Sequence, residues 1–425
     1  MDSFRFLTPD TIAYIRDIYA TPVFIYSEKI LREQARKVVG FPHAYGFTPR
    51  YAMKTSSNAN LLRIFASEWL HIDASSGYEV HRAMSAGIPA SHIQLTGQEM
   101  PRDLEEIVKL GVEFNATSLY QLETYGRLYP GTHTSIRVNP GMGSGGTNRT
   151  NVGWVWSSFG IWHEYLDDAK AIAKKYDLTI TKLHTHIGSG SDPEVWKKVA
   201  SMVLAIAARL PDVTIVSLGW GYKVARMDYE KTADLEEIWV HVKNLFIEFY
   251  EKYNRKLHLE IEPGTFLAAN SASLVTEVID IVDTAEDGYT FIKVNAGMTE
   301  VTRPSLYGAQ HPIIVVPVLP LEKGGRGDLF TKDYIVVGHN CESGDIFTPA
   351  PGDPEWLLPR TLIEATIWDT LVIESVWAYC ASMSTHGYNS FPEAGELLLR
   401  EDGSIVEIRR WAQVTELWRN EITIV

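Results

Sequence analysis

Residues 50–58 read RYAMKTSSN, a short apolar run that ends in a lysine just before a helical pattern. A lysine at the end of a buried strand either reaches back to solvent or takes part in chemistry, because a desolvated ammonium is costly and its pKa falls readily. For Lys54 taken alone, reaching solvent is the simpler interpretation. The surrounding chain decides between the two.

The run that ends at Lys54 is the first of eight strand-like segments that alternate with helical patterns. The strand-like segments cover residues 48–54, 70–74, 92–96, 112–116, 134–139, 180–186, 213–218 and 257–261. The helical patterns cover residues 58–68, 77–86, 101–110, 118–128, 161–176, 193–210 and 231–253. Such strands pair in parallel, because each crossover needs a helix-length connection. We predict a closed (β/α)8 TIM barrel over residues 28–268. The alternative is an open doubly wound sheet, but no G-x-G-x-x-G motif follows the first strand.

After residue 270 the pattern changes to short β-rich runs punctuated by glycine and proline. Strand-like runs cover residues 291–294, 313–316, 334–337 and 397–399, and only residues near 368–383 have a helical pattern. We predict a second, C-terminal β-barrel domain with Greek-key-like connections. The strand-like residues 22–26 are expected to join it, so that this domain comprises residues 1–27 plus 269–425.

Composition narrows the classes of function. The formal net charge of −14 and the absence of a basic block argue against a nucleic-acid or anionic-membrane partner. The two cysteines, Cys341 and Cys380, are too few for a disulfide framework and are consistent with a reducing, cytoplasmic location. No apolar run approaches the length that spans a bilayer. We therefore expect a cytoplasmic protein that acts on a small molecule.

Polar residues gather at the ends of the predicted barrel strands, where functional residues of this fold lie. They are Lys54, Asp73, His186 and Glu262, with the glycines of Gly219-Trp220-Gly221 after the seventh strand. Pyridoxal 5'-phosphate needs a lysine for its Schiff base, backbone N–H groups for its phosphate and an acid near its pyridine nitrogen. We therefore predict this cofactor, with Glu262 at the ring nitrogen. His184 and His186 raise the alternative of zinc, but no third ligand has a suggestive spacing, and we predict no metal.

These motifs resemble the pyridoxal-phosphate decarboxylases built on an alanine-racemase-like barrel, and among them the diaminopimelate decarboxylases. The likeness runs from about residue 20 to residue 400. It implies that Lys54, in YAMK, forms the Schiff base, and that Asp73 and Glu79 flank the cofactor. It also implies that His186 stacks on the pyridine ring and that Ser189 approaches the phosphate.

The resemblance assigns roles to further residues. It implies that Glu262 meets the ring nitrogen and that Cys341 donates a proton. The remaining implied cofactor-binding residues are Gly219, Gly221, Gly264 and Tyr379 or Tyr388, and the implied substrate-binding residues are Arg303, Tyr307 and Glu342. In the family, the segment that here reads CESGD (residues 341–345) comes from the second subunit. The resemblance therefore implies a homodimer with shared active sites.

The sequence also departs from the family pattern. Thr265 stands where Glu-Pro-Gly is usually followed by an arginine that helps hold the distal carboxylate of diaminopimelate, and Ser158, Trp220 and Phe391 replace other usual residues. Arg303 alone, or Arg137 or Arg149, could hold that carboxylate instead. We predict decarboxylation of a diamino acid, with meso-diaminopimelate converted to L-lysine and carbon dioxide. The alternatives are the same reaction on ornithine, lysine or carboxynorspermidine, an amino-acid racemase, and a non-catalytic cofactor-binding relative.

Overall fold

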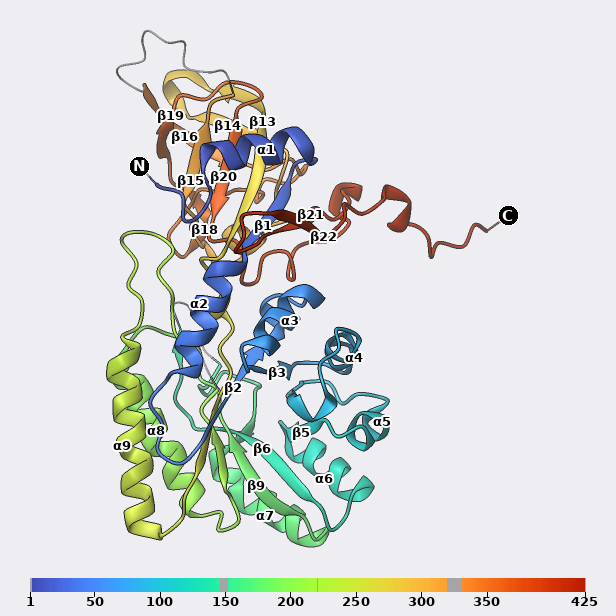
Figure 1. Cartoon of the computed structure of the whole chain (residues 1–425), viewed down its shortest axis with the longest axis vertical. Coiled ribbons are helices and arrows are strands. Elements are labelled where there is room, and N and C mark those ends of the chain that lie inside the picture. The colour runs from blue at the N-terminus through green and yellow to red at the C-terminus, as the bar shows by residue number, and fades with distance from the viewer. Residues whose placement is uncertain (1, 146–151, 220, 319–329, 425) are drawn as a thin grey trace. The chain divides into compact units, whose positions relative to one another are not determined.

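The computed structural model describes residues 2–145, 152–219, 221–318 and 330–424. These residues form two compact units (Figure 1). One unit, called here the barrel unit, comprises residues 32–225 and 230–267, and the other, the sheet unit, comprises residues 1–31, 226–229 and 268–425. The predicted barrel limits were 28–268, but residues 28–31, 226–229 and 268 group with the sheet unit.

The barrel unit contains a ring of parallel strands. They are β2 Phe47–Ala52, β3 His71–Ala74, β4 Ile93–Leu95, β5 Glu113–Ala116, β6 His133–Asn139, β9 Thr179–His184, β11 Ile215–Ser217 and β12 His258–Ile261. Each strand pairs with the next, β5 pairs with β6, and β12 pairs with β2. These pairings close the sheet on itself, so the predicted (β/α)8 barrel is confirmed. The short strands β7 Ser144–Gly145, β8 Ile161–Trp162 and β10 Gly188–Ser189 lie outside the ring.

Helices connect these strands and lie around them (Figure 1). They are α3 Ala59–Ser67, α4 Gly77–Ser85, α5 Leu104–Lys109, α6 Leu119–Leu128, α7 Leu166–Lys175, α8 Pro193–Ala208 and α9 Leu235–Tyr253. Helix α2 Glu28–Val39 precedes β2, and α10 Thr265–Ala268 follows β12. Asn58 and Ser76 show why helices begin where they do, since each side chain accepts a hydrogen bond from a backbone N–H of the first turn. The predicted helix over 161–176 was wrong at its start, because residues 161–162 form β8.

Charged side chains occupy part of the barrel interior. Arg50 on β2 bonds Glu260 on β12 at 2.9 Å and Glu113 on β5 at 2.9 Å. Lys182 on β9 also pairs with Glu113, at 3.0 Å, and makes a close contact with Glu260. Because β3 and β4 lie between β2 and β5 in the sheet, the pair of Arg50 with Glu113 spans the inside of the barrel. We call these four residues the buried ion cluster.

Replacing Glu260 with glutamine is expected to destabilise the protein by about 3–5 kcal/mol, because it leaves two buried cations facing one carboxylate. The charges of Arg50 and Lys182 outweigh the burial that opposes them and lower the pKa of Glu260 to about 2. Glu123→Gln is the matched control, because Glu123 pairs with Lys175 at the surface, where solvent screens the pair and its loss should cost little stability. Urea unfolding of both variants measures the difference, and equal losses would contradict the prediction.

The sheet unit is built on a mixed sheet with the strand order β19-β16-β14-β13-β1-β21-β22, in which β20 joins β13 to β15. Its strands are β1 Val23–Ser27, β13 Ala272–Asp283, β14 Thr290–Val294, β15 Ile313–Val316, β16 Thr331–Val337, β19 Arg360–Ile363, β20 Thr370–Glu374, β21 Gly395–Leu399 and β22 Ile405–Arg409. The strands β17 Pro349–Ala350 and β18 Asp353–Leu357 form a separate pair, and the α-helices are α1 Pro9–Ile18 and α11 Arg303–Tyr307.

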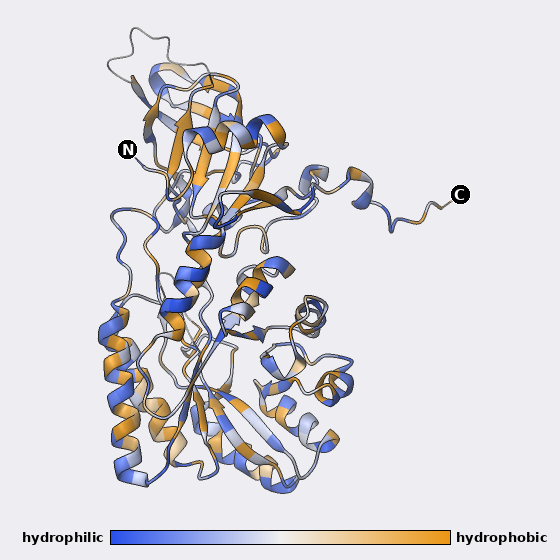
Figure 2. Ribbon diagram, in the orientation of Figure 1, coloured by the Kyte–Doolittle hydropathy of each residue, from blue (hydrophilic) through white to orange (hydrophobic). Residues whose placement is uncertain are grey.

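The N-terminal strand β1 lies inside this sheet, antiparallel to β13 and parallel to β21. Helix α1 covers it with Ile12 and Ile15, which pack with Val23, Ile25 and Leu397 in one apolar cluster. Figure 2 shows the apolar colour along the strands of this unit. The predicted β-rich second domain is therefore confirmed.

The predicted helix over residues 368–383 was wrong, because Thr370–Glu374 forms β20. All five residues of β20 are buried, and the strand pairs on both sides, with β13 and β15. A strand buried on both faces has no polar alternation, so its apolar run resembles that of a buried helix. Among the described residues, no helix is long and apolar enough to cross a membrane.

Candidate active site

Lys54 lies on a short 3-10 turn, Met53–Thr55, directly after β2. The strand ends at Ala52, so Lys54 follows it instead of closing it as predicted. The Thr55 hydroxyl donates to the Ala52 carbonyl at 2.8 Å and fixes the turn. Met53 and Thr55 are fully buried while Lys54 is exposed. The turn therefore directs the lysine away from the core at the carboxyl end of its strand.

Glu262, which follows β12, is a buried carboxylate with three donors. It accepts hydrogen bonds from His184 Nε2 at 2.8 Å, Gln94 Nε2 at 2.8 Å and Ser217 Oγ at 3.0 Å. Burial opposes its ionisation, but His184 and the hydrogen bond from Gln94 hold the pKa of Glu262 well below its usual range. Glu262 is therefore a fixed negative charge at the barrel mouth.

Asp73, the third residue of β3, is also buried and accepts from Gln94 Nε2 at 3.1 Å. Burial, and then the charge of Glu262, raise the pKa of Asp73 to about 8, while the charge of Lys54 acts in the opposite direction. The two carboxyl groups share one site, so one of them holds a proton at neutral pH.

The proton on Asp73 gives a pH dependence of stability that can be tested without cofactor. The pKa is about 8 in the folded protein and about 3.9 in an unfolded chain, so between these values the folded state binds the extra proton and stability falls as pH rises. Asp73→Asn should remove this slope and gain roughly 2–4 kcal/mol relative to the natural protein between pH 5 and pH 8. Urea unfolding across this window is the measurement, and parallel curves for the two proteins would refute the assignment.

Glu79, His186 and Ser189 lie near the same strand ends. The Glu79 carboxylate accepts from the Ser75 N–H at 2.7 Å, and burial raises its pKa. Burial, together with the charges of Lys54 and Arg137, lowers the pKa of His186 well below its usual range, so its ring is neutral. Ser189 is half-buried on β10. The charge of Lys54 acts to lower the pKa of Asp73, of Glu79 and of His186, so all three groups lie within the reach of that charge.

Glycines let the backbone approach closely at this end of the barrel. Gly219 has φ +60°, and a Cβ there would meet the Thr185 carbonyl and His186. A Cβ on Gly221 would meet the backbone of Gly188, and one on Gly264 would meet Thr55. A side chain at these positions would collide with its neighbours, so glycine lets the backbone segments pack this closely. Trp220 and Arg149, also singled out from the sequence, lie outside the described residues.

The donor set of the barrel mouth fits pyridoxal phosphate. An exposed lysine amine, a buried ionised carboxylate, a neutral histidine and glycine-rich turns are the groups that the cofactor requires. Within the described ranges, no three His, Cys, Asp or Glu side chains are placed to hold a metal ion. His184, the zinc alternative, instead bonds Glu262.

The sheet unit carries the second group of predicted residues. The Cys341 side chain is exposed, and its N–H donates to Asn389 Oδ1 at 2.8 Å. The Glu342 carboxylate accepts from the Gly344 N–H at 3.1 Å and from the Tyr388 hydroxyl at 3.4 Å. The backbone hydrogen bond from Gly344 and the hydroxyl of Ser343 lower the pKa of Glu342. The fold thus brings Cys341, Glu342 and Tyr388 together on one surface.

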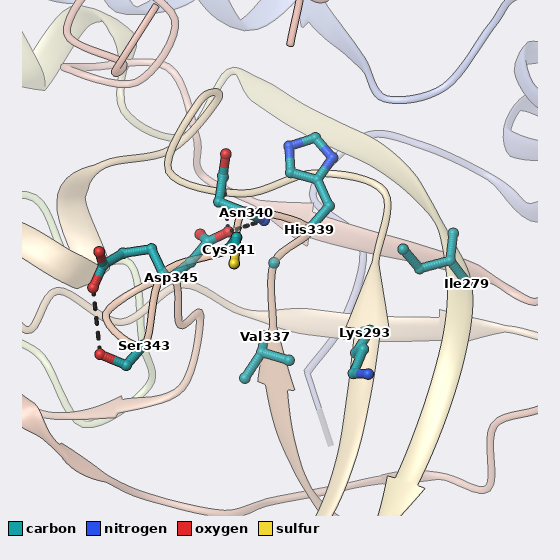
Figure 3. A pocket seen from close by; sticks show the side chains of 10 residues that line it. Ile279, Lys293, Val337, His339, Asn340, Cys341, Ser343 and Asp345 are labelled. Atoms are coloured by element: carbon teal, nitrogen blue, oxygen red, sulfur yellow. Dashed lines mark hydrogen bonds between the residues drawn. The ribbon is translucent and has the colours of Figure 1, made fainter. Parts of the chain in front are cut away.

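Asp345 fixes the turn that presents Cys341. Its carboxylate accepts from the N–H groups of Met298 at 2.7 Å and of Asn340 at 2.9 Å, and from Asn340 Nδ2 at 2.8 Å. A pocket of about 380 Å³ opens beside this turn (Figure 3). It is lined by Ile279, Lys293, Val337, Gly338, His339, Asn340, Cys341, Glu342, Ser343 and Asp345.

The other predicted residues of the sheet unit are Arg303, Tyr307 and Tyr379. Arg303 begins α11, and its Nε is buried without a hydrogen-bond partner among the described residues. Tyr307 ends the same helix and is half-buried. Tyr379 is half-buried with φ +61°, a strained conformation for a tyrosine. Only Tyr388 of the two tyrosines bonds Glu342.

The structure describes three of the four residues that depart from the family pattern. Thr265 begins α10, and Ser158 accepts from Gln98 Nε2 at 3.1 Å. Phe391 stacks on His339 with ring centroids 3.6 Å apart. Arg137 is buried beside the Phe159 ring, and burial lowers its pKa to about 10.

Sequence analysis missed Gln94 and Ser217, two donors to Glu262. Gln94 lies in the middle of β4, and Ser217 is the last residue of β11. A polar residue in a predicted buried strand was the available signal, because such a residue needs a partner.

Residues 28–269 match the pyridoxal-binding domain of the pyridoxal-dependent decarboxylases. The chain belongs to this family. The predicted family is thereby confirmed, as is the prediction of a decarboxylase, since curated relatives over nearly the whole chain carry that name.

Two curated relatives are similar to this chain over nearly its whole length. Diaminopimelate decarboxylase of Streptomyces coelicolor is 33% identical over 416 residues, covering 95% of this chain and 90% of the relative. Diaminopimelate decarboxylase of Escherichia coli K12 is 32% identical over 428 residues, covering 98% and 97%.

Solved structures agree with these relatives. A crystal structure of a diaminopimelate decarboxylase superposes with a TM-score of 0.89 at 30% identity, covering 98% of this chain and 97% of the other. The Helicobacter pylori diaminopimelate decarboxylase, complexed with L-lysine, gives a TM-score of 0.83 at 29% identity, covering 96% and 98%. The lysine/ornithine decarboxylase of Vibrio vulnificus, at 18% identity, shares the fold, with a TM-score of 0.74 and coverage of 92% and 99%.

Proposed function

We propose that this protein decarboxylates meso-diaminopimelate to L-lysine and carbon dioxide with pyridoxal 5'-phosphate as its cofactor. The observation that carries the proposal is the buried, ionised Glu262 in the same barrel mouth as the exposed Lys54. The named relatives over nearly the full chain support the choice of substrate. When bound, the cofactor would accept the electrons that are released as the bond between Cα and the carboxylate breaks.

Residues of the barrel unit would hold the cofactor. Lys54 would supply the amine that holds the cofactor covalently, and Glu262 would keep a proton on its ring nitrogen. Neutral His186 would pack on the ring, and Asp73 and Glu79 would adjust the charge around Lys54. Ser189, Gly219, Gly221 and Gly264 would bind the phosphate, and Tyr388 or Tyr379, which belong to the sheet unit, would bind it as well.

Residues of the sheet unit would bind the substrate. Arg303 has an unpartnered buried Nε within the described chain and would pair with the distal carboxylate, which compensates for Thr265. Tyr307 would support that contact, and Glu342 would bind the distal ammonium. Cys341 would deliver a proton to Cα, since its exposed thiol is a group that can donate one.

We further propose a cytoplasmic homodimer in which the Cys341 turn of one subunit completes the site of the other. The family resemblance supports the shared site, and two free cysteines are consistent with a reducing compartment. Mixing the inactive Lys54→Ala protein with the impaired Cys341→Ala protein tests it, because heterodimers would contain one intact site and restore about a quarter of the activity. A mixture no more active than its components would argue against shared sites.

Release of carbon dioxide tests the proposed reaction. The purified protein with added pyridoxal phosphate would be assayed on meso-diaminopimelate, both enantiomers of lysine and of ornithine, and carboxynorspermidine. We expect turnover of meso-diaminopimelate alone. Turnover only of substrates that lack the distal carboxylate would make Thr265 the mark of a changed specificity. No release from any of them would overturn the proposal.

Cys341→Ala should lower kcat by about 10- to 1,000-fold while leaving cofactor bound, because only the proton donor is lost. Cys380→Ala is the matched control, since that cysteine is fully buried in the sheet unit. Product analysis in deuterated water measures protonation at Cα. An unchanged rate in Cys341→Ala would remove this residue from the mechanism.

A further inference from the structure

Gln94, in the middle of β4, is fully buried and touches both acids of the barrel mouth. Its Nε2 lies 2.8 Å from Glu262 Oε1 and 3.1 Å from Asp73 Oδ1. It also lies 2.9 Å from Thr96 Oγ1, which itself accepts from Asn115 at 3.2 Å. One side-chain amide thus bridges the two carboxyl groups.

The orientation of this amide is fixed by Lys182. The Nζ of Lys182 donates to Gln94 Oε1 in a close contact, and an ammonium group has donors only. The oxygen of the amide must therefore face Lys182, which leaves the NH2 group to face the acids. Lys182 is itself held by Glu113 and Glu260, so the buried ion cluster determines which way Gln94 points.

The two acids depend on Gln94 to different degrees. Glu262 has two further donors, His184 and Ser217, and stays ionised without the amide. Asp73 has fewer donors, with Gln94 and Thr96 as its side-chain partners. Removing the amide would therefore change mainly the protonation of Asp73. Asp73 is also the acid whose pKa the charge of Lys54 lowers.

We propose that Gln94 is a positioning residue that sets the division of charge between Asp73 and Glu262 and, through Asp73, the proton affinity of Lys54 once the cofactor is bound there. The inference rests on the proposed function for the role of Lys54. The hydrogen bonds of Gln94 predict the direction in which the proton affinity changes when the amide is removed. Without the amide, Asp73 stays neutral to higher pH, and a neutral Asp73 stabilises a protonated Lys54 nitrogen less than a carboxylate does.

The test uses the holoenzyme of Gln94→Met, with Gln121→Met as the matched control. Gln121 is an equally buried glutamine in the barrel unit, but its Nε2 donates to the Gly97 and Gln98 carbonyls and contacts neither acid. The pH midpoint of the cofactor's visible absorbance should fall by about 0.5–1 unit in Gln94→Met, the amount that one hydrogen bond to a carboxylate supports. It should stay unchanged in Gln121→Met, although both variants lose thermal stability.

Separate outcomes distinguish this inference from the proposed function. A natural protein without Lys54-dependent absorbance would overturn the proposed function. A natural protein that shows it, with the same midpoint in Gln94→Met or an equal shift in Gln121→Met, would overturn the role of Gln94. If Gln94→Met does not fold, the double variant Lys182→Met, Glu113→Gln removes one cation and one carboxylate of the buried ion cluster together. It frees the amide, so the midpoint should fall here also, and an unchanged midpoint counts against the proposal.

Discussion

Lys54→Ala is expected to abolish carbon dioxide release, with a loss of about 10³-fold or more, and to eliminate the visible absorbance of lysine-bound cofactor. The 3-10 turn after β2 places this side chain in solvent while its neighbours are buried. The Lys54→Ala protein should therefore still fold. A loss of carbon dioxide release would then reflect a missing catalytic group and not a misfolded protein. Absorbance spectra and carbon dioxide release with added pyridoxal phosphate are the measurements.

Borohydride reduction adds a direct readout of the same residue. In the natural protein it should trap the cofactor on the peptide that contains Lys54, as seen by mass spectrometry. Lys175→Ala is the matched control, because Lys175 pairs with Glu123 at the surface of the barrel unit. Activity retained in Lys54→Ala, or label found on a different lysine, would refute the role.

Glu262→Gln should lower kcat by about 10²–10³-fold, because the ring nitrogen of the cofactor would lose the fixed negative charge that holds its proton. The folded structure should largely persist, since glutamine can still accept from His184 or Ser217 through its oxygen. The NH2 group of the new glutamine must, however, face either Gln94 or His184, which now donate to Glu262 Oε1 and Oε2. Two donors would then face each other, so we expect the variant to lose some stability as well as activity.

Steady-state kinetics separate these effects. The value of kcat should fall with little change in KM, because Glu262 would act on the cofactor and not on the substrate. Glu123→Gln, at the surface of the same unit, should leave kcat unchanged. A normal kcat in folded Glu262→Gln would exclude this residue as the partner of the ring nitrogen.

The sequence predicted the barrel well because its strands and helices alternate and most helices begin at clear capping residues. Lys54, Asp73 and Glu262 could be found because each lies at or just beyond the end of a barrel strand. Gln94 could not be found in this way, since its role depends on Lys182 and Glu262, which lie 88 and 168 residues away in the chain. Local patterns carry no information on such contacts.

The sheet unit was harder to predict in detail. Its β-rich character was evident, but Thr370–Glu374 was assigned to a helix, because a strand that pairs on both sides and is buried throughout shows no alternation. The hydrogen bonds of Asp345 that hold the Cys341 turn were also beyond prediction. One of them joins Met298, in the loop before α11, to Asp345, which lies 47 residues later.

The position of β1 within the sheet bears on how the protein is made. Val23 pairs with Val275 and with Gly395, so a ribosome that adds 5–20 residues per second completes the second neighbour roughly 20–75 s after the first residues of β1 appear. All five residues of β1 are buried in the finished protein, and β1 has neither partner strand until β13 is made and only one until β21 is made. The barrel unit can fold meanwhile, whereas the nascent N-terminus exposes an apolar strand that is prone to aggregation. We expect early release or truncation before β21 to yield an insoluble chain.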